Sequence, residues 1–117
     1  MRLIDKTIGK VIANRVELAD TFWKRFLGLM FRRKFPNGNA LFFNLQKSSS
    51  CSIHMFFVRF PIDLLYLDSR FMVVELHMKL KPWQIYIPKT VAKYIIELPA
   101  GTISRSKVKI GHKIKLQ

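Results

Sequence analysis

The run IDLLYLD at residues 62–68 constrains the fold more than any other stretch, because it is apolar on both of its faces. In an extended chain, Leu65 and Leu67 point to one side of the strand. Leu64 and Tyr66 then point to the other side. A strand of this kind is stable only when other structure covers both of its faces. The run therefore predicts a strand in the interior of a β-sandwich or barrel.

Other short runs are mainly apolar or alternate between apolar and polar side chains, as β-strands do. They lie at residues 2–6, 8–18, 40–46, 71–78 and 93–99. The short turn at residues 68–70 predicts that 62–68 and 71–78 form a hairpin. The polar residues 47–52 predict a loop. The order of these elements is typical of a mainly antiparallel β domain.

One longer segment has a helical period instead. Its apolar side chains are Phe22, Phe26, Leu29 and Met30. Their spacing of i, i+4, i+7 and i+8 places them on one face of a helix. We therefore expect one short α-helix near residues 20–31. With 117 residues the chain is expected to form a single domain over 1–117, a compact β-sandwich or barrel of short, mostly antiparallel strands.

The composition is strongly basic, with 21 Lys and Arg against seven Asp and Glu and a formal net charge of +14. A charge of this size attracts anionic partners, such as nucleic acid, acidic proteins and acidic ligands. A solubility coat around an apolar core would have the same charge, and the sequence leaves both interpretations open. The basic residues of interest are Arg32, Arg33 and Lys34, and then Lys107, Lys109, Lys113 and Lys115.

The tail at residues 107–116 alternates lysines with aliphatic side chains and so predicts an edge strand. Its expected core residues are Val108, Ile110, Ile114 and Leu116. Lysines on an exposed edge strand deter pairing with other chains. Because no aromatic side chains alternate with these lysines, only weak binding to nucleic acid is expected from them.

Four segments in this order resemble the family known as domain of unknown function 192 (DUF 192). They are RFLGLMFRR at 25–33, HMFFVRFPIDLLYLD at 54–68, IIELPAGT at 95–102 and KIGHKI at 109–114. The resemblance covers nearly the whole chain, and it implies a small β-sandwich or barrel with no established biochemical activity. The family usually has Gly-Asp near its C-terminus, where this chain has Gly111-His112.

Two carboxylic acids and a histidine lie in segments that are otherwise apolar. Asp63 is expected on the face of its strand that Leu65 shares, and Glu97 is expected half buried on another strand. A buried carboxylate needs a cation or several donors, and Arg25 or Arg32 could supply the charge. The structural interpretation is therefore an arginine–carboxylate pair or a carboxylate that holds a loop. The functional alternative is a small hydrolase-like enzyme in which His54, Asp63 and Glu97 form an acid–base site.

The sequence favours a small binding or interaction module without catalysis over this enzyme, because no nucleophile, base and orienting group are recognisable together. The loop between Pro82 and Pro88 carries Trp83 and Tyr86. Together with His54 and Arg32, these side chains are the candidates to line a ligand groove.

No metal site or cofactor is expected. Cys51-x-x-His54 supplies too few ligands for zinc, and no glycine-rich loop could hold a phosphate. The charged N-terminal residues do not form a signal peptide, and no apolar run is long enough to span a membrane. A single cysteine excludes an internal disulfide. These features predict a cytoplasmic protein.

Overall fold

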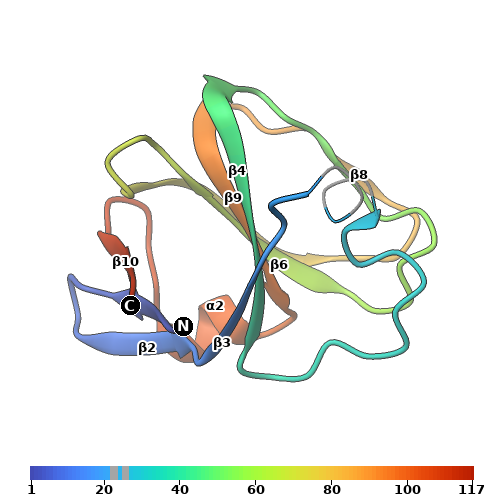
Figure 1. The fold of residues 1–117 in the computed structure, drawn as a ribbon, viewed down its shortest axis with the longest axis horizontal. Helices are drawn as coiled ribbons and strands as arrows, with labels where there is room; N and C mark the ends of the chain where they lie inside the picture. The colour runs from blue at the N-terminus through green and yellow to red at the C-terminus, as the bar shows by residue number, and fades with distance from the viewer. Residues whose placement is uncertain (22–23, 25–26) are drawn as a thin grey trace.

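The computed structural model describes residues 1–117 except 22–23 and 25–26. A five-stranded sheet with the order β3-β4-β9-β6-β7 crosses the molecule (Figure 1). Its strands are β3 (Arg15–Leu18), β4 (Asn39–Ser49), β9 (Ala92–Pro99), β6 (Ile62–Leu67) and β7 (Val73–Leu80). Neighbouring strands are antiparallel, except that β3 and β4 are parallel.

Smaller elements cover this sheet. A three-stranded sheet has the order β10-β1-β2, and β5 pairs with β8. These elements are β10 (Ile114–Leu116), β1 (Leu3–Asp5), β2 (Lys10–Ala13), β5 (Ile53–His54), β8 (Ile85–Tyr86) and the short helix α2 (Thr102–Ser106). The expectation of a compact, mainly β domain is confirmed. No helix in the described part of the chain is long and apolar enough to cross a membrane.

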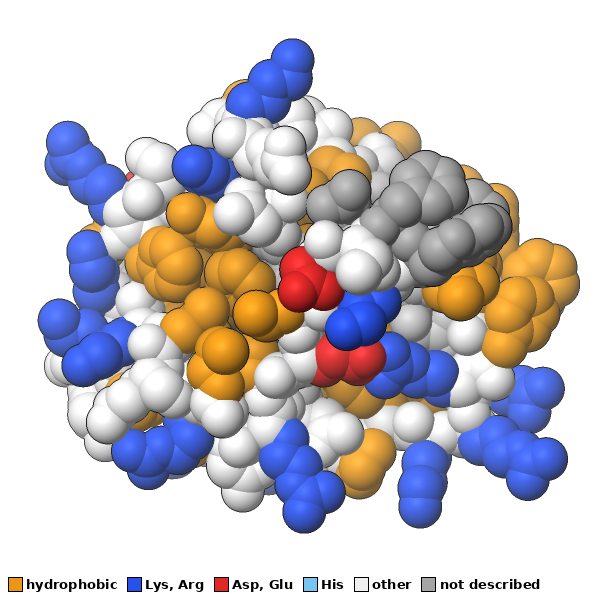
Figure 2. All heavy atoms as spheres, in the orientation of Figure 1, with side chains coloured by type: hydrophobic (Ala, Val, Ile, Leu, Met, Phe, Trp, Pro, Cys, Tyr) orange, Lys and Arg blue, Asp and Glu red, His pale blue; other side chains and the backbone are white. Residues whose placement is uncertain are grey.

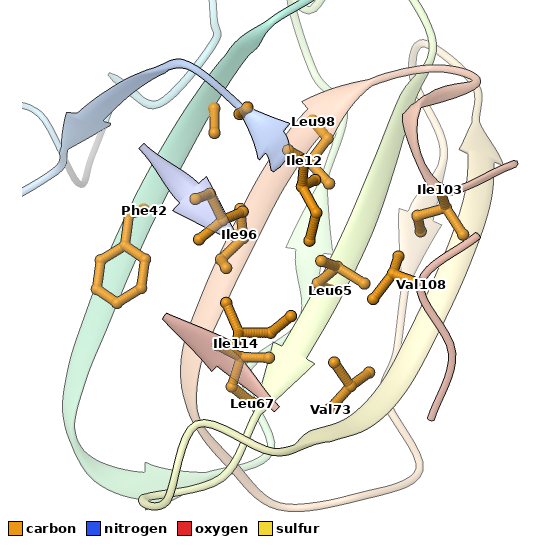
Figure 3. Packing of buried hydrophobic residues seen from close by; sticks show 13 residues of the cluster. Ile12, Phe42, Leu65, Leu67, Val73, Ile96, Leu98, Ile103, Val108 and Ile114 are labelled. Carbon is orange, nitrogen blue, oxygen red and sulfur yellow. The ribbon is translucent and has the colours of Figure 1, made fainter. Parts of the chain in front are cut away.

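Strand β6 is the interior strand that the sequence predicted, and all six of its residues are buried. Leu65 and Leu67 point to one face of the five-stranded sheet, which we call the closed face. There they pack with Ile12, Val108 and Ile114 from the smaller sheet and the chain after α2 (Figure 3). The residues that cover this cluster belong to β1, β2, β10, α2 and the chain after α2.

The other face of the same sheet, which we call the pocket face, carries Leu64 and Tyr66. They pack in a second cluster with Met55 and Val58, which belong to the chain between β5 and β6. Long loops and the small β5–β8 pair, instead of a full sheet, cover this face. The two faces of one sheet are therefore covered by different kinds of structure.

Several predicted boundaries change in the structure. The expected strand at 8–18 is divided between β2 and β3, which belong to different sheets. Strand β4 continues through the first half of the expected polar loop, to Ser49. The expected helix at 20–31 falls partly on residues outside the described part of the chain. Next to them, the Gly28 N–H donates to the Lys24 carbonyl at 2.9 Å, a bond of helical spacing.

The basic tail is not one continuous edge strand. Only Ile114–Leu116 form strand β10, at the edge of its sheet. Val108 and Ile114 are buried as expected, but Ile110 is 63% exposed. The prediction fails there because the chain turns at Gly111, whose φ of 93° is readily adopted only by glycine. The turn separates Lys107 and Lys109 from Lys113 and Lys115, so these lysines do not form a single stripe.

Candidate functional site

A pocket of about 240 Å³ opens on the pocket face of the five-stranded sheet. Most of its lining is apolar. The lining side chains from the sheet are Phe43, Leu45, Ile62 and Ile95, and those from the covering loops include Leu27, Leu29, Met30, Ile53, Met55 and Val58. The polar or titratable side chains on its wall are Glu97, Cys51, Ser52 and His54. Small ligand sites have this character, an apolar cavity with a few polar groups.

Glu97 is the buried acid of this pocket. It lies on β9 between Leu41 of β4 and Leu64 of β6, and its exposed fraction is 6%. Burial raises the pKa of its carboxyl from 4.5 to about 7, although the nearby Arg32 charge lowers it. Among the described residues, none donates a hydrogen bond to this carboxyl. The carboxyl is therefore much easier to protonate near neutral pH than an exposed glutamate.

Gly28 brings the covering loop close to the acid. A Cβ atom built on Gly28 would lie 4.0 Å from Glu97 Oε1 and 3.8 Å from the Phe43 ring, and its φ is +50°. Glycine adopts this left-handed conformation without steric cost. The Gly-Leu-Met stretch that carries part of the family resemblance thus forms a wall of the pocket.

His54 and Cys51 also line the pocket. The His54 ring is exposed, contacts the Phe56 ring at a centroid distance of 5.0 Å, and its Nδ1 accepts the Phe56 N–H at 3.3 Å. Cys51 is half-buried, and burial together with the Glu97 charge raises the pKa of its thiol. The structure thus brings His54 and Glu97 to one pocket.

Asp63 does not belong to this pocket. Its neighbour in register on β9 is Leu98, and Leu98 packs in the cluster on the closed face. The Asp63 carboxylate is fully buried and accepts N–H groups from Lys79 at 2.9 Å, Gly101 at 3.1 Å and Ile103 at 2.9 Å. Asp63 therefore holds the start of α2 against the sheet. His54, Asp63 and Glu97 do not meet as a single acid–base group.

Sequence reasoning missed Glu75, a second buried acid on the pocket face. Glu75 pairs in register with Tyr66 and is 7% exposed. Its carboxylate accepts the Thr90 hydroxyl at 2.6 Å, the Thr90 N–H at 2.9 Å and the Lys89 N–H at 3.0 Å. It also accepts the Tyr86 hydroxyl. The only signal in the sequence was an acid inside the apolar run FMVVELHM.

The hydrogen bonds to Glu75 decide its charge state. Burial alone would raise the pKa of this carboxyl, but the hydroxyls of Thr90 and Tyr86 and the two backbone N–H groups lower it below 4.5. Burial and the Glu75 charge in turn raise the pKa of Tyr86 to about 12. Tyr86, expected in a groove, thus serves to hold this acid.

Among the described residues, the other candidates are not part of the pocket lining. Arg32 Nη2 donates to Glu17 Oε2 at 2.7 Å, and Arg25 is outside the described residues. Trp83 is 60% exposed beside Phe56 and Phe57. Arg33, Lys34, Lys107, Lys109 and Lys115 are exposed, and Lys113 is half-buried. Figure 2 shows Lys and Arg around the outline of one face, with few acidic side chains.

The unusual Gly111-His112 pair has a structural partner. His112 Nδ1 lies 2.6 Å from Asp5 Oδ2, and Asp5 is fully buried. The Asp5 carboxylate also accepts the Thr7 N–H at 3.0 Å. The pair joins the C-terminal turn to β1. Within the described residues, no three His, Cys, Asp or Glu side chains gather as metal ligands do.

Comparison with known proteins gives a family and a shared fold. A sequence profile of the family described as DUF192, uncharacterized ACR, matches residues 4–116. A UPF0127 protein of Thermococcus sibiricus is 50% identical over 115 residues, which cover 96% of this chain and 72% of the relative. A UPF0127 protein of Pyrococcus furiosus is 42% identical over 114 residues, which cover 97% of this chain and 96% of the relative.

Two crystal structures have the same architecture. A Sinorhizobium meliloti protein, whose name suggests a transcription regulator, has a TM-score of 0.85 at 27% identity and aligns over 97% of this chain and 89% of its own. A Novosphingobium aromaticivorans protein of unknown function has a TM-score of 0.87 at 21% identity. The alignment covers 99% of this chain and 84% of that protein. The second likeness shows the fold alone.

Proposed function

The chain belongs to the DUF192 family, and we propose that it is a small binding module whose Glu97 pocket holds a small, mostly apolar ligand with a cationic or hydrogen-bond-donating group. The family description and the names of the Thermococcus and Pyrococcus relatives assign no activity. The proposal therefore depends on the chemistry of the pocket.

The observation that carries the proposal is a buried glutamic acid on the wall of an apolar pocket. Ionised carboxylates in such surroundings are costly unless a cation or several donors compensate them. A protonated amine that entered the pocket would supply both a charge and donors. The apolar wall would meanwhile remove the hydrocarbon part of the ligand from water.

The separation of Asp63 from the pocket favours binding over acid–base catalysis. A general base needs a partner that orients it or a nucleophile within hydrogen-bonding reach. Asp63 lies on the closed face with both oxygens occupied by backbone N–H groups. His54 and Glu97 alone remain for the enzyme alternative. A hydrolase activity that disappears in His54→Ala with unchanged thermal stability would support that alternative and contradict ours.

The test uses simple probes of one size and different charge: n-hexylamine, 1-hexanol and hexanoate. We expect n-hexylamine to raise the melting temperature most and hexanoate least, because only the folded state offers the pocket. The preference for the amine over the alcohol should grow as the pH rises through about 7, where Glu97 ionises. Equal shifts from all three probes, or none from any, would contradict the proposal.

Two variants separate the pocket from general charge effects. Glu97→Gln should remove the preference for the amine and leave the weak effect of the alcohol. Asp20→Asn makes the same change of charge at a side chain that is 63% exposed, and it should change nothing. Cys51 offers a second readout, since it is the only cysteine and lines the pocket. A bound amine should slow its alkylation by iodoacetamide.

Weak, salt-dependent binding to nucleic acid is a second candidate function, in a cytoplasmic setting. The net charge of +14 favours it, and so does the suggested role of the Sinorhizobium relative. Exposed Lys107, Lys109 and Lys115 are the residues to test. At physiological salt we expect an oligonucleotide Kd in the non-specific range, about 10⁻⁴–10⁻⁶ M. A sub-micromolar Kd that is lost when these lysines become Gln would instead show an organised nucleic-acid binding surface.

A further inference from the structure

Four exposed aromatic side chains form one surface cluster, which we call the aromatic patch. They are Phe31, Phe56, Phe57 and Trp83, with exposed fractions of 59%, 40%, 50% and 60%. Their ring centroids are 5.0 Å apart for Phe31–Phe57, 5.0 Å for Phe57–Trp83 and 5.9 Å for Phe56–Trp83. Contiguous exposed apolar patches of this kind mark interaction sites on soluble domains.

The patch is held in place by the backbone of the loops that carry it. The Phe31 N–H donates to the Phe57 carbonyl at 2.9 Å, which joins the first two loops. The Trp83 N–H donates to the Met55 carbonyl at 2.9 Å, and the Met55 N–H donates to the Gln84 carbonyl at 2.8 Å. The exposed rings therefore have a defined arrangement, although they come from distant parts of the sequence.

Three residues of the patch have a backbone conformation that bulky side chains seldom adopt. The φ angles are 66° for Phe31, 62° for Phe57 and 68° for Trp83. Residues with a Cβ atom seldom adopt this left-handed region, because the Cβ atom comes too close to the following carbonyl oxygen. Strain of this sort often occurs at functional sites. Here it accompanies side chains that are half exposed and so stabilise the core little.

The loops that carry the patch contain cations and no acidic residue. No Asp or Glu occurs between Asp20 and Asp63, or between Glu75 and Glu97. The three loops of the patch lie within these two intervals. Arg59 lines the same hollow as Phe31, Phe57 and Trp83, and further cations of these loops are Arg33, Lys34 and Lys81. The surroundings of the patch therefore complement an anionic surface.

Two features favour a lipid surface over a nucleic-acid strand. Ile85 and Ile87, which follow Trp83 closely in the chain, are 55% and 72% exposed, and bases do not stack on aliphatic side chains. The ring of Phe57 stacks on Phe31 and meets Trp83 edge-on, so part of the ring surface is already occupied. Figure 2 shows hydrophobic side chains protruding at the right-hand edge, where loops meet in Figure 1.

We propose that the aromatic patch docks the domain on the surface of an anionic lipid bilayer. Trp and Phe enter the interface between headgroups and acyl chains, and Arg59, Lys81 and their neighbours meet the lipid phosphates. This proposal does not depend on the ligand pocket. The two sites are nonetheless adjacent, because Val58 lines both the pocket and the hollow in the patch.

The experiment measures co-sedimentation of the full chain with vesicles of phosphatidylglycerol and phosphatidylcholine, against vesicles of phosphatidylcholine alone, at about 0.1 M salt. We expect binding to the anionic vesicles only. Replacing Arg59 and Lys81 by Gln should weaken it by about fivefold for each cation.

Phe57→Gly and Trp83→Gly are the informative variants, because glycine relieves the left-handed strain while it removes the ring. Each should fold at least as stably as the parent and bind anionic vesicles about tenfold more weakly. Gln46→Gly is the matched control: it also replaces an exposed residue with positive φ, 65°, and it removes no charge, but it lies on β4, outside the three loops of the patch. It should bind like the parent.

Three outcomes would overturn the proposal. The first is no binding to anionic vesicles, or equal binding by the glycine variants and the parent. The second is a dimer that the same variants dissociate, with no affinity for vesicles, since the patch would then be a contact between copies. The third is single-stranded DNA binding that the variants abolish while vesicle binding persists unchanged.

Discussion

Glu75 and Glu97 point to the same face of the same sheet and expose almost the same fraction, 7% and 6%, yet their carboxyl groups behave in opposite ways. Glu75 lies on the edge strand β7, and four groups of residues 86–90 donate hydrogen bonds to it, so its pKa is lowered. Glu97 lies on the central strand β9 beside a pocket, and its pKa is raised to about 7. Burial alone therefore does not decide what an acid does in this fold.

The hydrogen-bond donors around each acid explain the difference. Hydrogen bonds that favour the ionised form make Glu75 part of the folded framework. Desolvation without such bonds from the described residues leaves Glu97 costly when it is ionised. An acid of the first kind stabilises the fold, and an acid of the second kind is available to a ligand. The following predictions test this contrast, from the largest effect to the smallest.

Glu75→Ala should lower the free energy of unfolding by about 3–4 kcal/mol, because it leaves several donors without their charged acceptor. Urea unfolding near neutral pH measures the change. In the parent, the contribution of Glu75 is present above about pH 4.5 and is lost as the pH falls through the lowered folded pKa. Asp20→Ala, at a 63% exposed side chain, should cost less than about 0.5 kcal/mol. An equal loss of unfolding free energy in the two variants would show that Glu75 does not stabilise the fold.

Asp63→Asn should lower the free energy of unfolding by about 2–3 kcal/mol. Both Asp63 oxygens accept backbone N–H groups, and an Asn amide would turn its NH₂ toward one of them. Asp68→Asn is the matched control, because only Asp68 Oδ1 accepts, from Arg70 and Met72, and an Asn oxygen can replace it. Its expected cost is below about 0.5 kcal/mol. A small effect at Asp63 would contradict its assignment as the anchor of α2.

Glu97→Gln should have the opposite sign and increase the free energy of unfolding by about 1–3 kcal/mol near pH 8. The folded pKa of Glu97, about 7, lies above the unfolded value of 4.5, so parent stability falls as the pH rises between them. Below about pH 4.5 both states are protonated, and the two proteins should have nearly equal stability. Urea unfolding from about pH 4 to 8 measures this. If the free energies of unfolding of parent and variant changed in parallel with pH, the negative charge of ionised Glu97 would be compensated by other groups in the folded protein.

Thr90→Val should cost about 1 kcal/mol and raise the pKa of Glu75, because it removes one of the two hydroxyl donors. A carbon-13 NMR titration of the glutamate carboxyl carbons measures the pKa directly. Tyr86→Phe should act in the same direction, since it removes the other hydroxyl. Tyr94→Phe, at a ring that contacts Phe71 at 4.4 Å, is the control and should leave this pKa unchanged. An unchanged pKa in Thr90→Val would assign the lowering to other groups.

The strands and their burial could be predicted where the pattern of residues adjacent in the sequence determines them. The two apolar faces of residues 62–67 predict the interior strand β6, and the turn at 68–70 predicts the β6–β7 hairpin; both are present. The alternating tail misled the prediction at Ile110, since alternation persists across a turn at Gly111. The Gly111 N–H donates to the Val73 carbonyl at 2.8 Å, a contact between distant residues that spacing does not show.

The site was predictable only in part. His54 and Glu97 were chosen because polar groups in apolar segments need an explanation, and both line the pocket. Asp63 was chosen for the same reason and lies on the closed face. The aromatic patch was missed except for Trp83, because its rings come from three loops that only backbone hydrogen bonds bring together.

The amino-acid sequence by itself determined the mainly β class, the buried central strand, the basic surface and the family, since these follow from local pattern and composition. Only the tertiary structure decided which buried acid is stabilised as a carboxylate and which is not. The donors to Asp63 come from residues 79, 101 and 103, and those to Glu75 come from residues 86–90. Gly28, far from Glu97 in the chain, closes over its carboxyl. A carboxylate is stabilised or left available by groups that folding brings to it, and their positions are set by packing across the sheet.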